Sequence, residues 1–496
     1  MQNEKNILLM IKNLIKNILF ICFALLSLQI QTVTAHSGKP KYHIIIDSDG
    51  AVDDMRAITM FLACDDVRVL GITGSQGSVK PYSAAMKITS LLSDFFHQGI
   101  PVGVGKSVNS DLPEWNSFSE SNHWGDNIPD RSIQFPKAID LMNNVVEGYN
   151  EKIILIALGG FTNYAEWLKT KPENIQKIER IIWYNDRNTE QGFNYLIDKN
   201  SFDYIKTLNI PIQIVSNTRN DLICDTTFLN NIQNVNTIYA KQIVSVHKQP
   251  QALEKVLQNH LLLWDDLLPL FLTCPIIFNT DEQKNNITYV NLEKQIPKDF
   301  ITEIIATLLI SGTETNNRVF QKFPIDTMLY KKPVAKIQAR TIEDYGLIEW
   351  KAIVMTNEIH GHTGIYSIIG AKMGIRACEY FNVGINNLQV ISFAGKTPPL
   401  SCLNDGIQIS TGATIGQGLI EVSDTICSIP TAIFEFNNKR IKVKLKEVLA
   451  QKIQEDIKKG VQLYNFTEQY WLYIEELALQ YWANFDKHNI FEIEKL

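Results

Sequence analysis

The sequence has few cysteines, no long basic run and no apolar stretch of membrane-spanning length. Its 7 cysteines in 496 residues are scattered without C-x-x-C spacing, which excludes a disulfide-dense scaffold. The 47 basic and 53 acidic residues give a net charge of -6, so we do not expect a nucleic-acid partner. With 45% hydrophobic and 20% charged residues, the composition is that of a globular protein and not of a disordered, collagen-like or polytopic membrane protein.

The N-terminus has the pattern of an export signal. Lys5, Lys12 and Lys16 precede an uncharged apolar stretch at 18–28, which is shorter than the ~20 residues of a transmembrane helix. Small residues then lead to Ala35, after which cleavage is expected. The sequence therefore predicts a signal peptide over 1–35 and a periplasmic or secreted protein that meets the membrane only during export.

The rest of the chain predicts an α/β fold. Short β-branched runs are followed by helical stretches, and the runs are continuously hydrophobic, as in strands that are covered on both faces. These runs lie at 43–46, 67–73, 153–156, 181–184 and 212–215. We expect a mostly parallel, Rossmann-like sheet in a domain over 40–335 and a second, smaller α+β domain over 340–496. Ligands of such sheets gather at the carboxyl ends of the strands.

Four carboxylates lie within eight residues at the end of the first predicted strand: Asp47, Asp49, Asp53 and Asp54. Like charges this close raise one another's pKa or recruit a cation, and oxygen ligands favour Ca²⁺ or Mg²⁺. Capping of the predicted helix 52–63 accounts for two of the four at most. The sequence therefore predicts a metal site here.

Two enzyme families begin with this kind of string. The residues DSDG followed by Ala51 and Val52 resemble the start of haloacid-dehalogenase-type phosphatases, in which Asp47 would be a nucleophile. With the trailing aspartate pair, the string is similar to the D-x-D-x-x-x-D-D signature of inosine-uridine preferring nucleoside hydrolases. The segments VLGITGSQG at 69–77, LIALGGFTN at 155–163, GFN at 192–194 and WD at 264–265 favour the nucleoside hydrolases. This resemblance covers about 42–330.

The resemblance implies a calcium site. Asp49 would be a metal ligand and the general base that takes a proton from water. The further ligands would be Asp54, Asp265 and the main-chain carbonyl of Leu158, and Asp47 would support the loop from behind. Ca²⁺ suits such a set, because it accepts six to eight oxygen ligands.

The resemblance also implies a ribose and a base site. Asp53 and Asn194 would hydrogen-bond the ribose. Three residues depart from the family: Ser75 stands where an Asn is usual, Gly192 where a Glu is usual, and Asp186 near a ribose-binding Asn. Trp264 resembles the indole that stacks on the base in the purine-preferring branch, and Trp124 is a weaker candidate for a second stacking wall.

The implied function is calcium-dependent hydrolysis of the N-glycosidic bond of purine ribonucleosides to free base and ribose. The expected partner is a small-molecule nucleoside, and we expect a homo-oligomer. Two alternatives stay open at this point, namely the phosphatase and a non-catalytic riboside-binding or metal-handling protein.

The second domain resembles the FmdE family of formylmethanofuran dehydrogenase subunits. The motifs that carry this resemblance are EIHGHTG at 358–364, GAKMG at 370–374 and CLNDGIQ at 402–408. His360, His362 and Cys402 are a possible second metal site, for Zn²⁺ or another transition metal. The family often continues its H-G-H motif with a Cys, and this sequence has Thr363 and Gly364 there, so one ligand is missing. Apolar residues at helical spacing over 470–482 predict a core or dimer face.

Overall fold

The computed structural model describes residues 40–126, 130, 132–281, 285–310, 319–423 and 428–496. The predicted signal peptide and Cys427 lie outside the described residues. Residues 40–496 form one compact unit. No helix in the described part of the chain combines the length and the apolar character needed to cross a membrane.

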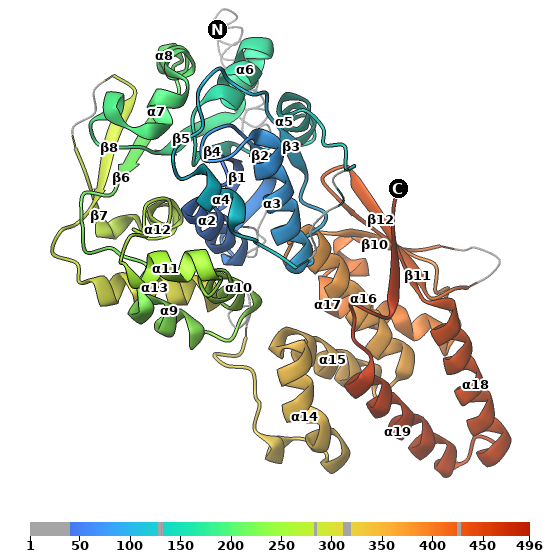
Figure 1. The fold of residues 1–496 in the computed structure, drawn as a ribbon. Coiled ribbons are helices and arrows are strands. Elements are labelled where there is room, and N and C mark those ends of the chain that lie inside the picture. Colours follow the sequence, from blue (N-terminus) through green and yellow to red (C-terminus); the bar gives the residue numbers. More distant parts are fainter. Residues whose placement is uncertain (1–39, 127–129, 131, 282–284, 311–318, 424–427) are drawn as a thin grey trace, which may run out of the picture. The chain divides into compact units, whose positions relative to one another are not determined.

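An eight-stranded sheet forms the centre of the N-terminal part (Figure 1). Its strand order is β3-β2-β1-β4-β5-β6-β8-β7, and every neighbouring pair is parallel except β7 and β8. The strands are β1 (Tyr42–Ser48), β2 (Val67–Gly74), β3 (Val102–Val104), β4 (Ile153–Ala157), β5 (Ile178–Tyr184), β6 (Ile212–Ser216), β7 (Phe278–Thr280) and β8 (Ile287–Leu292). The predicted fold class is confirmed, and all five predicted runs lie in strands.

Helices cover both faces of this sheet, because alternate side chains of each strand point to opposite faces. Ile44 and Ile46 belong to one buried cluster, and Ile45 between them belongs to another. The helices are α2 (Val52–Ala63), α3 (Pro81–Asp94), α4 (Asn116–Ser121), α5 (Ala138–Glu147), α6 (Thr162–Thr170), α7 (Phe193–Ile197), α8 (Lys199–Thr207), α9 (Thr226–Gln233), α10 (Ile238–His247), α11 (Pro250–Leu257), α12 (Leu267–Thr273) and α13 (Lys298–Ile310).

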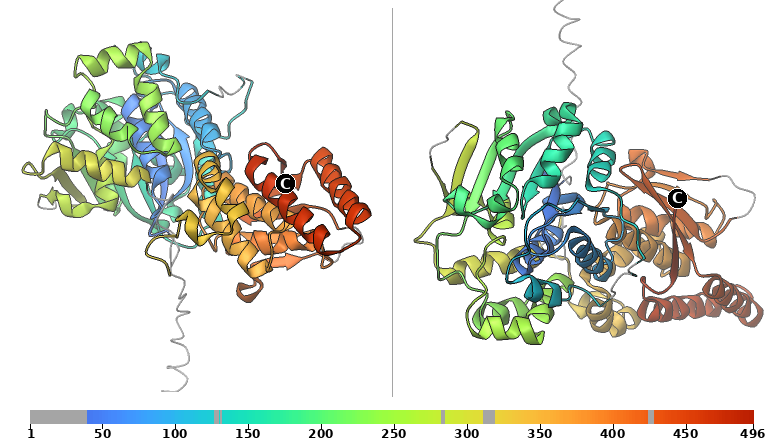
Figure 2. Two further views of the ribbon diagram at one scale, coloured as in Figure 1. Left: turned by 90° about the horizontal axis from the view of Figure 1, so that it is seen from below. Right: turned by 45° about the horizontal axis from the view of Figure 1, so that its top comes forward.

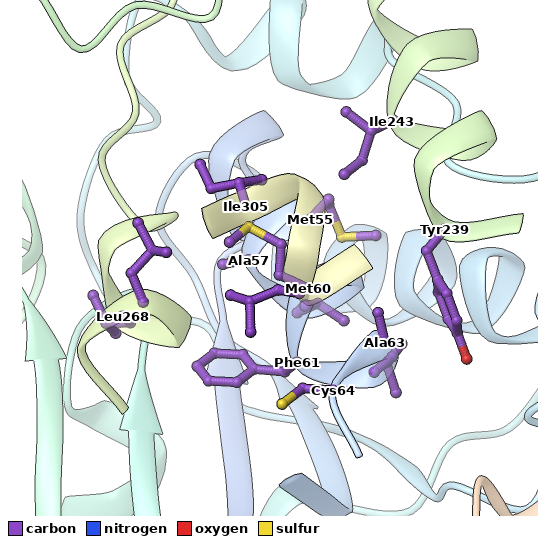
Figure 3. Close-up of a cluster of buried hydrophobic side chains, with 14 of the residues drawn as sticks. Met55, Ala57, Met60, Phe61, Ala63, Cys64, Tyr239, Ile243, Leu268 and Ile305 are labelled. Atoms are coloured by element: carbon purple, nitrogen blue, oxygen red, sulfur yellow. The ribbon is translucent and has the colours of Figure 1, made fainter. Parts of the chain in front are cut away.

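Helix α2 has the bounds that the sequence predicts and is buried along almost its whole length. Figure 3 shows Met55, Met60 and Phe61 of α2 among side chains from α10, α12 and α13. A helix that is apolar on all sides is held by its neighbours in a fixed position. The first turn of α2 carries Asp53 and Asp54, so this packing fixes where the two carboxylates lie.

The C-terminal part has its own five-stranded sheet of order β10-β9-β11-β12-β13. Its strands are β9 (Gln389–Ser392), β10 (Ile420–Val422), β11 (Thr431–Phe436), β12 (Lys439–Leu445) and β13 (Phe491–Lys495), and only the β9–β10 pair is parallel. Its helices are α14 (Lys332–Tyr345), α15 (Leu347–His360), α16 (Ile365–Phe381), α17 (Leu403–Thr411), α18 (Glu447–Tyr464) and α19 (Glu468–Asn484).

Helix α19 lies beside α18 (Figure 2). The apolar residues that the sequence placed at helical spacing are buried in the core here, as Tyr470, Ile474, Leu477, Ala478 and Tyr481. The segment after α3 contacts α16, where the amide of Gly99 donates to the carbonyl of Tyr380 over 2.7 Å.

Candidate active site

The carboxyl ends of the central strands bring the sequence motifs together. Asp47 of β1 is in register with Thr73 of β2 on one side and with Ala157 of β4 on the other. Asp49 and Leu158 follow directly at the same edge of the sheet, which is where parallel α/β sheets bind their ligands.

Asp53, Asp54 and Asp265 converge at this edge. One carboxylate oxygen from each residue lies within 4.8 Å of the others, and no second group of three or more potential metal ligands is found among the described residues. Asp53 and Asp54 come from the first turn of α2, whereas Asp265 lies just before α12. The fold therefore joins two predicted ligands that are more than 200 residues apart, together with Asp53, which the resemblance assigned to the ribose.

Asp54 is anchored through one oxygen. Its Oδ2 accepts hydrogen bonds from Ser48 Oγ at 2.7 Å, from the amide of Asp49 at 2.9 Å and from the amide of Gly50 at 3.3 Å. Burial raises the pKa of Asp54 to about 7, the nearby charge of Asp53 adds to the rise, and the Ser48 hydroxyl opposes it. The anchored oxygen orients the carboxyl group and leaves the other oxygen for a cation.

The other carboxyl groups are strained electrostatically in the same way. Burial, followed by the charge of Asp54, raises the pKa of Asp265 well above its usual range. Burial also raises the pKa of Asp53 to about 6, although the guanidinium of Arg56 opposes this rise. Asp265 Oδ1 and Asp49 Oδ1 are buried without a hydrogen-bond partner. Crowded carboxylates with such oxygens fit a hard divalent cation.

Asp49 is 2% exposed but does not belong to the convergent group of three. Its carboxylate lies against the turn after β2, where a Cβ atom on Gly77 would come within 2.0 Å of Asp49 Oδ2. Burial and then the charge of Asp54 raise the pKa of Asp49 well above its usual range, whereas hydrogen bonds from Ser78 lower it. A raised pKa suits a group that accepts a proton.

Leu158 and Asn194 lie together beside the carboxylates. Asn194 Nδ2 donates to the carbonyl of Leu158 at 2.7 Å and to the carbonyl of Tyr184 at 3.0 Å. Ser75 is 1% exposed, and its amide donates to the carbonyl of Ser48 at 2.8 Å. All three predicted positions are therefore at the same edge of the sheet.

Asp186 is exposed, and the structure places its neighbour Asn185 at the inner position. Asn185 is 1% exposed, its Oδ1 has no hydrogen-bond partner, and a Cβ atom on Gly192 would lie 2.0 Å from that oxygen. Sequence reasoning missed Asn185. The signal was available, because Asn185 directly follows the β5 run.

The tryptophans divide into core and site residues. Trp124 is 1% exposed and packs against His247 in the core, so it is not a stacking wall. Trp264 is half-buried and directly precedes Asp265. Trp115, which the sequence analysis did not select, is 45% exposed, donates from Nε1 to Ser78 Oγ and packs edge-on against Phe193 at 4.8 Å.

Asp47 is enclosed behind the site. It is fully buried, and its Oδ1 accepts hydrogen bonds from Thr73 and from Asn163. Burial raises its pKa to about 7. A carboxyl group in this position supports the loop and is closed to a phosphate ester, so the geometry does not favour the phosphatase alternative.

In the C-terminal part, His360 and His362 lie with ring centroids 4.3 Å apart at the end of α15. Asp405 Oδ2 lies 2.9 Å from His360 Nδ1, and His360 Nε2 is buried without a partner. Cys402 is half-buried at the start of α17. These side chains do not form a group of three close ligands in the described part of the chain.

Taken together, the parallel sheet and the carboxylates at its carboxyl edge define an α/β protein with a candidate hard-metal site. Residues 44–287 match the model of the inosine-uridine preferring nucleoside hydrolase family, and residues 359–486 match the model described as FmdE, molybdenum formylmethanofuran dehydrogenase operon. The chain thus belongs to the nucleoside hydrolase family, with an FmdE-like domain behind the hydrolase part, as the motifs predicted.

Curated relatives match part of this region. The pyrimidine-specific ribonucleoside hydrolase RihA of Klebsiella pneumoniae is 28% identical over 180 residues, which are 34% of this chain and 58% of the relative. RihA of Enterobacter sp. is 27% identical over the same shares. The chain therefore spans less than two thirds of the length of these relatives.

Solved structures of nucleoside hydrolases are similar to the hydrolase part. A plant nucleoside hydrolase matches 54% of this chain and 98% of its own, at 20% identity and a TM-score of 0.44. The purine-preferring ribonucleoside hydrolase from Gardnerella vaginalis matches the same shares, at 19% identity and a TM-score of 0.45.

Proposed function

We propose that this protein is a calcium-dependent nucleoside N-ribohydrolase that converts a ribonucleoside and water to free base and ribose. The observation that carries the proposal is the convergence of Asp53, Asp54 and Asp265 at the sheet edge beside Asp49, in a region that belongs to the nucleoside hydrolase family. Asp49, Asp54, Asp265 and the Leu158 carbonyl are the proposed metal ligands, and the position of Asp53 lets it contact both metal and ribose.

The chain's own groups suit this hydrolysis. Bound Ca²⁺ would lower the pKa of a coordinated water and hold the ribose hydroxyls. Asp49 takes a proton from the attacking water, the water oxygen bonds to C1′, the C1′–N bond breaks, and the leaving base takes up a proton. Positive charge builds up on the sugar as the bond breaks, so the surrounding carboxylates stabilise the transition state.

Asn194 and Asn185 are placed to position the ribose. Asn194 gives its Nδ2 to two main-chain carbonyls, which leaves its Oδ1 to accept from a ribose hydroxyl. The buried Oδ1 of Asn185 is a second acceptor.

We propose a purine as the base, on the support of exposed aromatic surface around the site. Trp264 directly precedes a proposed ligand, and Trp115 with Phe193 forms an aromatic pair next to Ser78. Flat aromatic faces stack on heterocycles, and a two-ring base offers more area. The RihA relatives are named pyrimidine-specific, so the test includes both kinds of base.

The test is release of ribose from inosine, adenosine, guanosine, uridine and cytidine by the purified chain, with Ca²⁺ and after EDTA treatment. We expect turnover with Ca²⁺, faster for purines, and its loss in EDTA and in Asp49→Asn. Binding of nucleosides without ribose release would instead support the non-catalytic alternative. No ribose from any of the five would refute the proposed activity.

For the C-terminal part we propose a Zn²⁺ or other transition-metal site at His360, His362 and Cys402. A carboxylate that holds one nitrogen of a histidine while the other stays open is typical of metal-binding histidines, and His360 with Asp405 has this arrangement. Elemental analysis of the intact chain tests this proposal, because His360→Ala would lose a transition metal that the wild type retains.

Export and self-association complete the proposal. N-terminal sequencing of the protein from the periplasm or medium would give a start after Ala35. Exposed apolar side chains on α18 and α19, among them Leu463, Trp471 and Leu472, support a homo-oligomer. Light scattering of the purified protein measures its mass, and a monomer would refute this part.

A further inference from the structure

Arg56 lies one turn into α2 and is 1% exposed. Its guanidinium makes four polar contacts. Nε donates to Asp266 Oδ1 at 2.8 Å and Nη2 donates to Asp266 Oδ2 at 2.7 Å, so the pair is bidentate. Nη2 also donates to the carbonyl of Leu262 at 3.0 Å, and Nη1 lies 3.1 Å from His247 Nε2.

These contacts fix the tautomer of His247. A guanidinium only donates, so His247 Nε2 accepts and its proton is on Nδ1, 2.7 Å from the carbonyl of Ile243. His247 and Asp266 are both fully buried. The cation is therefore enclosed by a carboxylate, a neutral imidazole and a main-chain carbonyl, and each of its partners restricts its position.

The partners of Arg56 flank Asp265 in the sequence. Leu262 lies three residues before Asp265, and Asp266 directly follows it, so Arg56 holds the segment on both sides of this carboxylate. Asp265 itself has a buried oxygen without a hydrogen-bond partner. Asp54, in contrast, is fixed locally by three donors from the turn after β1.

We propose that Arg56, with Asp266 and His247, positions Asp265 against Asp53 and Asp54 and so sets the geometry of the metal site. This inference rests on the proposed function, because it concerns the same site. Arg56 is a positioning residue, since it acts on the cation through Asp265. A bidentate pair suits this task, because two parallel hydrogen bonds fix orientation as well as distance.

A purely stabilising role makes a different prediction. A buried ion pair that is replaced by apolar residues of similar size often costs no stability, whereas removal of one partner leaves an unpaired buried charge. The double variant Arg56→Met/Asp266→Leu therefore separates folding from positioning. We expect it to unfold near the wild-type temperature while losing the geometry of the metal site.

The experiment measures Ca²⁺ affinity of the full chain by titration calorimetry, alongside its unfolding temperature. Loss of groups that orient metal ligands typically costs ~10- to 100-fold in metal affinity. We expect a loss in this range for the double variant. Lys372→Met is the matched control, because Lys372 pairs with Glu349 in a fully buried ion pair of the C-terminal part, and its Ca²⁺ affinity should stay at the wild-type value.

A folded double variant with wild-type Ca²⁺ affinity overturns the inference. If the double variant fails to fold, Arg56→Lys decides, since it keeps the charge but not the bidentate contact. A ~3-fold or greater loss of affinity in Arg56→Lys supports the inference, and a smaller change overturns it. A wild type that binds Ca²⁺ but releases no ribose refutes the proposed activity and leaves the affinity comparison decisive, whereas a wild type that binds no Ca²⁺ overturns both.

Discussion

Replacement of Asp54 by Asn should stabilise the metal-free protein and abolish its stabilisation by Ca²⁺. The Asn Oδ1 can accept the three hydrogen bonds that Asp54 Oδ2 now accepts, and its amide would face Asp265. The substitution therefore removes a charge while it keeps the local contacts. Asp344→Asn, at an exposed carboxylate on α14, is the matched control and should change neither property.

The size of the effect follows from the pKa of Asp54. That pKa rises from 3.8 to about 7, and each pKa unit corresponds to ~1.36 kcal/mol. Ionisation of this buried group therefore lowers the free energy of unfolding by up to about 4 kcal/mol above pH 7. At roughly 2 °C per kcal/mol, Asp54→Asn should raise the unfolding temperature by up to about 8 °C in EDTA at pH 8.

Calcium should reverse the order of the two proteins. Ligand at a thousand times its dissociation constant stabilises the wild type by ~4 kcal/mol, and Asp54→Asn should gain almost nothing. Scanning calorimetry at pH 8, with EDTA and with Ca²⁺, measures both differences. An Asp54→Asn protein that unfolds below the wild type in EDTA would refute the electrostatic reasoning.

Three further predictions concern the same site. In EDTA the wild type should gain stability as the pH falls from 8 to about 6.5, because the raised folded-state pKa of Asp47 and Asp54, about 7 each, makes protonation favour the fold; calorimetry would contradict this if stability fell over that range, and Ca²⁺ should flatten the profile. Gly77→Ala should lower turnover at least ~10-fold, since its Cβ would lie 2.0 Å from Asp49 Oδ2; Gly416→Ala, in open space, should leave turnover unchanged, and equal rates for both variants would count against the assigned position of Asp49. Trp115→Ala should raise KM for purine nucleosides ~5-fold or more with little change in kcat, while Trp115→Phe keeps most of the stacking; an unchanged KM in Trp115→Ala would remove Trp115 from the base site.

Below about pH 6.5 the gain in stability should stop. Burial lowers the pKa of His97 to about 4 and that of His247 to about 3. A histidine whose folded-state pKa is lowered favours unfolding once the pH falls below its unfolded value of 6.5. The metal-free protein should therefore be most stable near pH 6.5.

The parallel sheet, the bounds of α2 and the edge at which the site lies could all be predicted from the sequence. Strands covered on both faces must be continuously apolar, so runs such as 153–156 and 181–184 were visible without any tertiary information. Asp49, Ser75 and Leu158 directly follow such runs, and parallel strands bring their carboxyl ends to one edge. Local pattern was enough wherever local geometry sets the position.

Which side chains face the site, and what holds them there, depends on tertiary packing. Trp124 and Trp115 look equivalent as letters, but one is enclosed beside His247 and the other is 45% exposed beside Ser78. Burial depends on neighbours that are distant in sequence, so no local pattern separates the two. Arg56 is likewise a lone charge within an apolar helix, and its partner Asp266 lies 210 residues away. The contact that places Asp265 exists only once the sheet and its covering helices have packed.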